Sequence, residues 1–217
     1  MILYIFCLLI GSAHCQNVST TYTLAGDCPD VKLQENLDGT RFSGLWYNIA
    51  SFASDNRPIN DCATMEFQED YMGFTLRETY IDTGVEIGNR TQKSYFARVD
   101  PTFDAGNRGK FVISYENGDN VLQFPVSVLT SDYDDFAILY TCKNMGRKAK
   151  MHYLFTWVLT RSKEKLEGEH LKKVENALSK YTELAEHRSY FVFKNFSEAS
   201  CAFNIKQEID SFSTNFW

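Results

Sequence analysis

The chain has 217 residues, with 22 Lys and Arg against 28 Asp and Glu, so its formal net charge is −6. This acidic balance, without any basic block, argues against nucleic acid and anionic membranes as partners. Aromatic residues make up 15% of the chain and hydrophobic residues 44%. These numbers exclude collagen-like, disordered and transmembrane classes of protein.

The first residues have the composition of an export signal. Met1–Ile10 is an uncharged apolar run, and small residues follow it. The run is too short to span a bilayer, which needs roughly 20 apolar residues, but it suits a secretory signal. We expect residues 1–15 to be a signal peptide that is cut after Cys15, and residues 16–27 to be an N-terminal segment. With no second long apolar run, we predict a secreted, extracellular protein that does not insert into membranes.

Removal of the signal leaves four cysteines: Cys28, Cys62, Cys142 and Cys201. An even number of cysteines in an exported chain predicts two disulfides, and three pairings are open. No CxxC pair and no histidine cluster occurs, so we expect no metal site. Sequons of the form N-x-S/T predict glycosylation at Asn17, Asn89 and Asn195.

Between Gly44 and Arg161, short β-rich runs alternate with polar turns that are rich in Gly, Asp and Asn. The predicted strands are Leu45–Ala53, Cys62–Gln68, Phe74–Ile81, Thr91–Val99, Lys110–Tyr115, Val121–Thr130, Phe136–Cys142 and Met151–Thr160. Eight strands with short connections can close into an up-and-down antiparallel barrel that has no free sheet edge. The spacing is typical of a β-sandwich or a barrel, so we predict an all-β fold. We expect one barrel domain over residues 28–204 and a C-terminal tail over residues 205–217.

Two further elements are expected after the barrel strands. Lys165–Leu184 has apolar residues at helical spacing, which predicts one amphipathic helix packed outside the barrel. Tyr190–Phe193 predicts one more short strand. The helix would cover the outer face of Met151–Thr160, because that face is not fully polar.

The inside of the barrel is the candidate site. An eight-stranded barrel either fills with side chains or holds one small ligand. Rings with a polar group suit a pocket that stacks on a conjugated ligand, and four such residues are Tyr80, Tyr95, Tyr115 and Tyr153. The alternative that these rings only fill the barrel stays open. No GxSxG, HExxH, P-loop or GxGxxG signature nominates catalytic residues, so we expect no enzyme.

Three segments resemble the signatures of the lipocalin family, in order and at suitable spacing. Gly44-Leu-Trp46 follows Asn36-Leu-Asp38, Asp132-Tyr133 lies in Leu129–Tyr133, and the third segment is Trp157–Arg161. The resemblance implies a lipocalin barrel in which Arg161 packs against Trp46 at the closed end.

Within the family the likeness is strongest to insect bilin-binding proteins and insecticyanins, through Gly26–Lys32, Phe155–Lys163 and Asn195–Cys201. It implies the disulfides Cys28–Cys142 and Cys62–Cys201. It also implies that the residues lining the ligand site near the mouth are Glu78, Tyr80, Tyr95, Tyr115, Leu122, Phe124, Tyr153 and Phe155. Phe74 shares the inward face of Phe74–Ile81 and joins this predicted set.

The resemblance implies a secreted carrier of a small hydrophobic ligand, first of all biliverdin or a related bilin. Glu78 stands where a bilin binder is expected to have a neutral or basic group, which leaves the ligand's identity open. Alternatives are an apolipoprotein D-like carrier of fatty acid, sterol or retinoid, a lipocalin-type isomerase with a free cavity cysteine, and a macromolecule-binding lipocalin. Assembly into a homo-oligomer is also open.

Overall fold

The computed structural model describes residues 23–53, 60–70, 73–83, 89–102, 108–146 and 150–203. The predicted signal peptide, the Asn17 sequon and the predicted tail lie outside these ranges. No helix of the described residues is long and apolar enough to cross a membrane.

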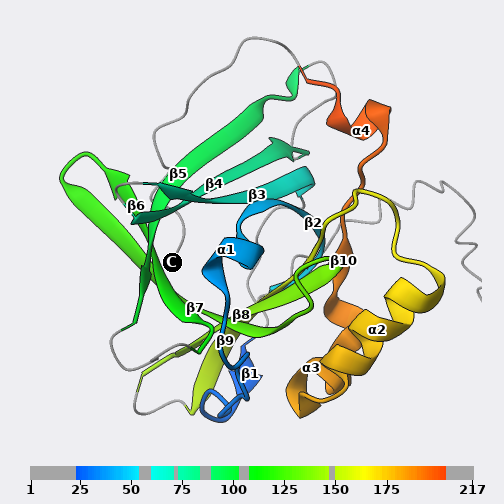
Figure 1. Ribbon diagram of the computed structural model, residues 1–217. Coiled ribbons are helices and arrows are strands. Elements are labelled where there is room, and N and C mark those ends of the chain that lie inside the picture. The colour runs from blue at the N-terminus through cyan, green and yellow to red at the C-terminus, as the bar shows by residue number, and fades with distance from the viewer. Residues whose placement is uncertain are drawn as a thin grey trace, which may run out of the picture.

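Eight strands form the closed barrel that the sequence predicts (Figure 1). Each strand pairs antiparallel with its neighbours in sequence, and β9 also pairs with β2, which closes the sheet. The all-β barrel prediction is confirmed. The barrel strands are β2 Gly44–Ala53, β3 Asn60–Asp70, β4 Gly73–Asp82, β5 Gln92–Pro101, β6 Lys110–Asn117, β7 Asn120–Ser131, β8 Phe136–Asn144 and β9 Met151–Thr160.

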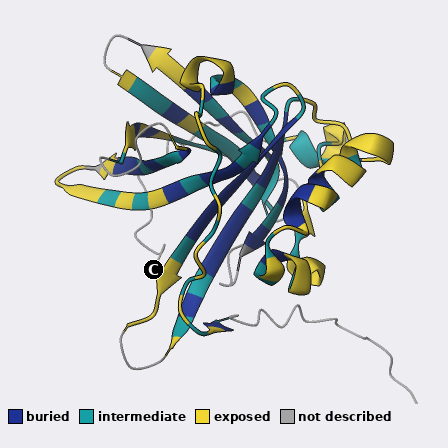
Figure 2. Cartoon of the chain, turned by 60° about the horizontal axis from the view of Figure 1, so that its bottom comes forward, coloured by how far each residue is buried: buried dark blue, intermediate teal, exposed yellow. Residues whose placement is uncertain are grey.

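Side-chain alternation divides the core into an inner and an outer cluster, because successive residues of a strand face opposite sides. On β9, Trp157 and Leu159 belong to the inner cluster, whereas Leu154 and Val158 belong to the outer one. The outer cluster lies under the helices that cover β8 and β9, and Figure 2 shows those strands buried along most of their length.

The predicted helix over Lys165–Leu184 is divided in the structure. α2 spans Gly168–Leu178 and α3 spans Thr182–Glu186, with extended backbone at Tyr181 between them. The Tyr181 hydroxyl lies within hydrogen-bonding distance of two carbonyls, Lys32 at 2.9 Å and Leu129 at 3.1 Å, which share its single proton. These contacts hold Tyr181 against segments that are distant in sequence and give a physical reason for the break.

Short elements complete the sheet at both ends of the chain. β1 (Leu24–Ala25) pairs with β9, and β10 (Val192–Phe193) pairs with β2. The predicted strand Tyr190–Phe193 is therefore two residues shorter, since Arg188–Tyr190 forms a 3-10 turn named η2. α4 spans Glu198–Cys201. Figure 1 shows the C-terminal segment running from α3 past β2 to α4 beside β3.

Two disulfides fasten these terminal segments to the barrel. They join Cys28 to Cys142 on β8, and Cys62 on β3 to Cys201. This is the pairing that the family resemblance implies. The same segments therefore reach the barrel both through backbone pairing and through a covalent bond.

One end of the barrel is closed by α1 (Gly39–Phe42), which Figure 1 shows across the barrel interior. Asp38 caps this helix by accepting from the Arg41 amide at 3.0 Å. The ring of Phe42 is fully buried in the inner cluster, so the short helix acts as a plug. We call this the α1 end and the other end of the barrel the opposite end.

Trp46 and Arg161 form the expected cation–π pair beside α1. The Arg161 guanidinium carbon lies 3.6 Å from the centre of the Trp46 ring. The guanidinium also donates to the carbonyls of Arg41, Ser43 and Leu45 at 2.9–3.0 Å. Gly44 leaves room for this contact, because a Cβ atom there would lie 3.3 Å from Arg161 Nη1 and its φ is +98°.

Candidate functional site

The polar groups of the barrel interior meet in the half nearer the opposite end. The Tyr115 hydroxyl donates to Glu78 Oε2 at 2.6 Å. Between β4 and β5, the hydroxyls of Tyr80 and Tyr95 lie 3.3 Å apart, and their rings stack with centroids 5.8 Å apart. Because Glu78 pairs directly with Tyr95 in the β4–β5 register, the two pairs form one continuous polar group.

Aromatic side chains surround this polar group. Phe124 meets Tyr115 edge-to-face with ring centroids 5.7 Å apart, and Leu122 lies opposite Tyr115 in the β6–β7 register. From β9, Tyr153 and Phe155 occupy the same inward face as Trp157. We call the set Glu78, Tyr80, Tyr95, Tyr115, Leu122, Phe124, Tyr153 and Phe155 the tyrosine chamber.

The tyrosine chamber is reached by solvent. Six of its eight side chains, all but Tyr115 and Phe155, are only half-buried although they lie on the inward face. Inward residues nearer α1, such as Trp46 and Phe67, are fully buried. An inward side chain that water can touch marks interior space that is not packed with protein.

One phenol of the tyrosine chamber, that of Tyr80, has a raised pKa. Burial is the main cause that raises the pKa of the Tyr80 hydroxyl, and its hydrogen bond with Tyr95 raises it further. The Tyr80 hydroxyl can therefore both donate and accept a hydrogen bond. With the Glu78 carboxylate as acceptor, the chamber offers polar groups to a mainly apolar, conjugated ligand.

Two further residues of this half were missed by the sequence reasoning. Lys93 lies opposite Tyr80 in the β4–β5 register, so it takes an inward position nearer the strand end than Glu78. Trp157 stacks on Phe155 with ring centroids 6.5 Å apart. Side-chain alternation could have found both, because Lys93 lies two residues from Tyr95 and Trp157 two residues from Phe155, on the same strand faces.

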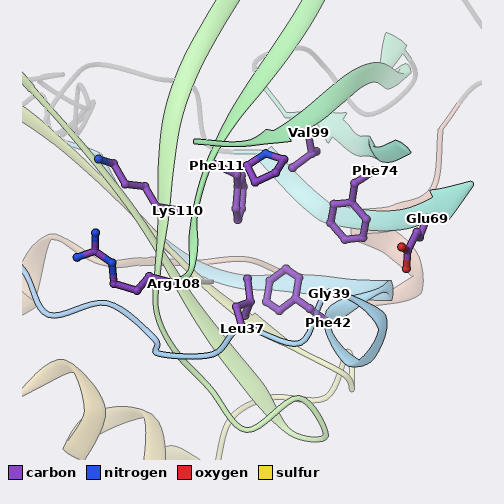
Figure 3. Close-up of a pocket in the computed structure, with 10 residues that line it drawn as sticks. Leu37, Gly39, Phe42, Glu69, Phe74, Val99, Arg108, Lys110 and Phe111 are labelled. Atoms are coloured by element: carbon purple, nitrogen blue, oxygen red, sulfur yellow. The ribbon is translucent and has the colours of Figure 1, made fainter. Parts of the chain in front are cut away.

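Phe74 lies apart from the other predicted ligand residues, at the α1 end. It lines a cavity of about 250 Å³ with Leu37, Gly39, Phe42, Glu69, Val99, Pro101, Arg108, Lys110 and Phe111. Figure 3 shows the rings of Phe42, Phe74 and Phe111 around this space, with the charged ends of Arg108 and Lys110 directed away from the rings. We call it the α1-end cavity.

The described residues offer neither a thiol nor a metal cluster. All four cysteines among them are disulfide-bonded, and these residues contain no group of three or more His, Cys, Asp or Glu side chains that could hold a metal ion. A cavity cysteine, which the isomerase alternative requires, is therefore lacking in this part of the chain. The sequon residues Asn89 and Asn195 are both exposed.

Comparison with known proteins agrees with this architecture. The sequence is 30% identical to insecticyanin-B of Manduca sexta, covering 82% of this chain and 84% of that protein. It is 28% identical to the bilin-binding protein of Pieris brassicae, covering 82% and 89%. The solved structure of Manduca sexta insecticyanin superposes with a TM-score of 0.74 at 28% identity, covering 84% of this chain and 93% of that one.

The family assignment rests on a match that includes every barrel strand. The sequence model of the lipocalin / cytosolic fatty-acid binding protein family matches residues 43–195. This range runs from the residue before β2 to the residues after β10. The chain therefore belongs to the lipocalin / cytosolic fatty-acid binding protein family.

Proposed function

We propose that the protein is a carrier that binds a bilin in the tyrosine chamber. The observation that carries the proposal is the Glu78–Tyr115 hydrogen bond of 2.6 Å on an inward, aromatic-walled face that solvent reaches. Aromatic walls remove a conjugated ligand from water, and a few fixed polar groups orient it. The similarity to insecticyanin and to a bilin-binding protein supports the same ligand class.

The chemistry of a bilin suits the order of polar groups along β4 and β5. A linear tetrapyrrole carries pyrrole N–H donors and propionate carboxylates. Glu78, deeper in the barrel, would accept from the N–H groups, whereas Lys93, nearer the strand end, would attract a propionate. A carboxylate beside the propionates would repel them, so we propose that the propionates face the strand ends.

Export is part of the proposal. Two disulfides that each close more than 100 residues of chain indicate folding in an oxidising compartment. The apolar run at residues 1–10 and the exposed Asn89 sequon support the same route. Mass determination of the protein from its natural source would test it, since we expect loss of residues 1–15 and one or more attached glycans.

The test of bilin binding is a titration of the ligand-free protein with biliverdin, followed by visible absorbance. We expect saturation at one bilin per chain and a changed red absorption band. Glu78→Gln should weaken binding about tenfold, since it removes a charge-assisted acceptor. No saturable change in the spectrum would overturn the proposal.

A matched control separates this effect from a general loss of stability. Glu66 lies on the outward face and accepts from Arg77 Nε at 3.0 Å. Glu66→Gln makes the same chemical change outside the chamber and should leave biliverdin affinity within twofold. Equal losses in the two variants would contradict the role of Glu78.

A retinoid is the second candidate ligand. The sequence is 26% identical to retinol-binding protein 4 of Mus musculus, covering 76% of this chain. A retinoid offers one polar group, whereas a bilin offers both N–H donors for Glu78 and a carboxylate for Lys93, so the bilin is favoured. Mass spectrometry of an organic extract from natively purified protein distinguishes the two ligands directly.

A further inference from the structure

We infer that the α1-end cavity is a second binding site, separate from the tyrosine chamber, for one small uncharged aromatic molecule. The inference does not depend on the ligand of the chamber. It rests on the chemistry of the cavity walls, on the packing that divides the barrel interior, and on the volume.

Most side chains that line the α1-end cavity are apolar. The side chains that face it in Figure 3 include Phe42, Phe74, Val99 and Phe111. The three phenylalanine rings lie around Phe67, which is fully buried. The centroid of the Phe67 ring is 5.1 Å from that of Phe42, 5.9 Å from that of Phe74 and 6.3 Å from that of Phe111. A further aromatic ring can meet these rings edge-to-face or offset-stacked.

Buried residues divide this cavity from the tyrosine chamber on three successive strands. On β4, Leu76 lies between Phe74 and Glu78, on the same face. Ala97 on β5 and Ile113 on β6 take the equivalent places, between Val99 and Tyr95 and between Phe111 and Tyr115. The exposed fractions of Leu76, Ala97 and Ile113 are 1%, 7% and 3%. We call these three residues and Phe67 the partition.

The class of ligand follows from the volume and the position of the charges. An apolar cavity of ~150 Å³ is enough to hold benzene, and this cavity measures about 250 Å³. A charged group placed among the phenylalanine rings would lose its hydration without a partner. Glu69, Arg108 and Lys110 lie on the cavity's margin, so a small polar substituent on the ligand is tolerated only there.

The test is a titration of the full-length protein with toluene, followed by the methyl signals of the protein in carbon–proton NMR spectra. We expect saturable shifts of the Leu37 and Val99 methyls, with those of Leu122 in the chamber unchanged. Repeating the titration with biliverdin present separates the two sites. Biliverdin should change the toluene affinity by less than twofold. The titration without biliverdin tests the α1-end cavity by itself, so it remains decisive even if biliverdin does not bind.

Substitutions in the α1-end cavity and in the tyrosine chamber show which of the two holds toluene. Phe74→Trp enlarges a wall of the α1-end cavity and should weaken toluene binding at least tenfold. Phe124→Trp makes the same substitution in the tyrosine chamber and should change the affinity by less than twofold. Gly39→Leu is a second filling variant that the fold should accept, because a Cβ atom at Gly39 meets no heavy atom within 4 Å. It too should weaken binding at least tenfold.

Three outcomes overturn the inference. The first is the absence of saturable shifts at Leu37 and Val99. The second is a shift centred on Leu122, which places toluene in the chamber. The third is an unchanged affinity in both folded filling variants, which shows that toluene binds elsewhere.

Discussion

At the scale of single residues, Arg161 joins several separate segments of the chain at the α1 end. It stacks on Trp46 and donates to the carbonyls of Arg41, Ser43, Leu45 and Tyr133. These carbonyls lie at the end of α1, at the start of β2 and in the β7–β8 turn. A planar guanidinium can serve all of them at once, whereas an ammonium group cannot.

Arg161→Lys should therefore lower the free energy of unfolding by about 2–4 kcal/mol, since several charge-assisted hydrogen bonds and the ring contact are lost. Urea denaturation followed by circular dichroism measures this. Arg98→Lys is the control, because Arg98 is exposed and its Nε lies 3.7 Å from Glu116 Oε1. It should change the stability by less than about 0.5 kcal/mol. An equal loss in both variants would contradict this role of Arg161.

Lys194 is a second informative residue. Burial lowers the pKa of its ammonium group to about 8 from an ordinary value of 10.5, although Asp61 nearby opposes this shift. Its backbone amide donates to the Ile49 carbonyl at 2.8 Å, which holds the residue against β2. The folded protein thus gives up this proton at a lower pH than the unfolded chain does.

Between pH 8 and 10.5 the unfolded chain binds more protons at Lys194 than the folded one, so this residue makes stability rise with pH. Lys194→Met should remove that contribution. The measurement is urea denaturation of the unmodified protein and of Lys194→Met at pH 7.5 and pH 10. The contributions of other titrating groups cancel when the changes in the free energy of unfolding are compared between the two proteins. An identical pH dependence in both proteins would show that Lys194 titrates alike in the two states.

At the scale of elements, contacts distant in sequence decide how the terminal segments lie. His152 on β9 illustrates this, with Nδ1 3.0 Å from the Gly26 carbonyl and Nε2 2.9 Å from Glu183 on α3. One outward side chain thereby links the N-terminal segment, the barrel and the C-terminal helices. The outer cluster is built from pieces that lie far apart along the chain.

The disulfide Cys62–Cys201 should matter most for the C-terminal segment. It spans 139 residues, so chain-entropy estimates allow a loss of up to ~5 kcal/mol when both cysteines are replaced by serine. Beside it, the Cys62 amide donates to the Asn195 carbonyl at 3.1 Å. We expect faster hydrogen exchange at Lys194 and at residue 62 in the double variant.

The matched control is the double serine variant of Cys28 and Cys142, which spans 114 residues. It should show a similar loss of stability but faster exchange near β1 instead. Equal exchange changes in both segments would mean that the disulfides stabilise the molecule only as a whole.

The helical region shows where prediction from sequence ends. Spacing of apolar residues indicates which side of a helix is buried, but a break depends on contacts made elsewhere. Tyr181 bonds to carbonyls 149 and 52 residues away. No local pattern encodes such partners, and the predicted single helix was therefore too long.

At the scale of the whole molecule, the β-rich runs and the polar turns between them predicted the strands, and the family resemblance predicted the barrel. The predicted Met151–Thr160 coincides with β9, and Phe74–Ile81 falls one residue short of β4 at each end. Alternation also separates inward from outward residues, but it does not give their height along the barrel axis. Phe74 was therefore grouped with Glu78 and Tyr80, although Leu76 separates it from them.

A bilin that binds only the folded barrel should stabilise the whole molecule. At a free biliverdin concentration 100 times the Kd, the free energy of unfolding should rise by about 2.7 kcal/mol. Thermal unfolding with and without biliverdin measures this, and Glu78→Gln should show a smaller rise at the same concentration. A melting temperature independent of biliverdin would contradict binding to the native barrel.

The partition also limits how long a ligand can be. From Glu78 to the end of β4 at Asp82 there are four residue steps, or about 13 Å along the strand and less along the axis of a barrel with tilted strands. A linear tetrapyrrole can coil to fit such a shallow cup. A long acyl chain or polyene would have to fold back or extend past the strand ends, so we expect the depth of the barrel to favour compact ligands.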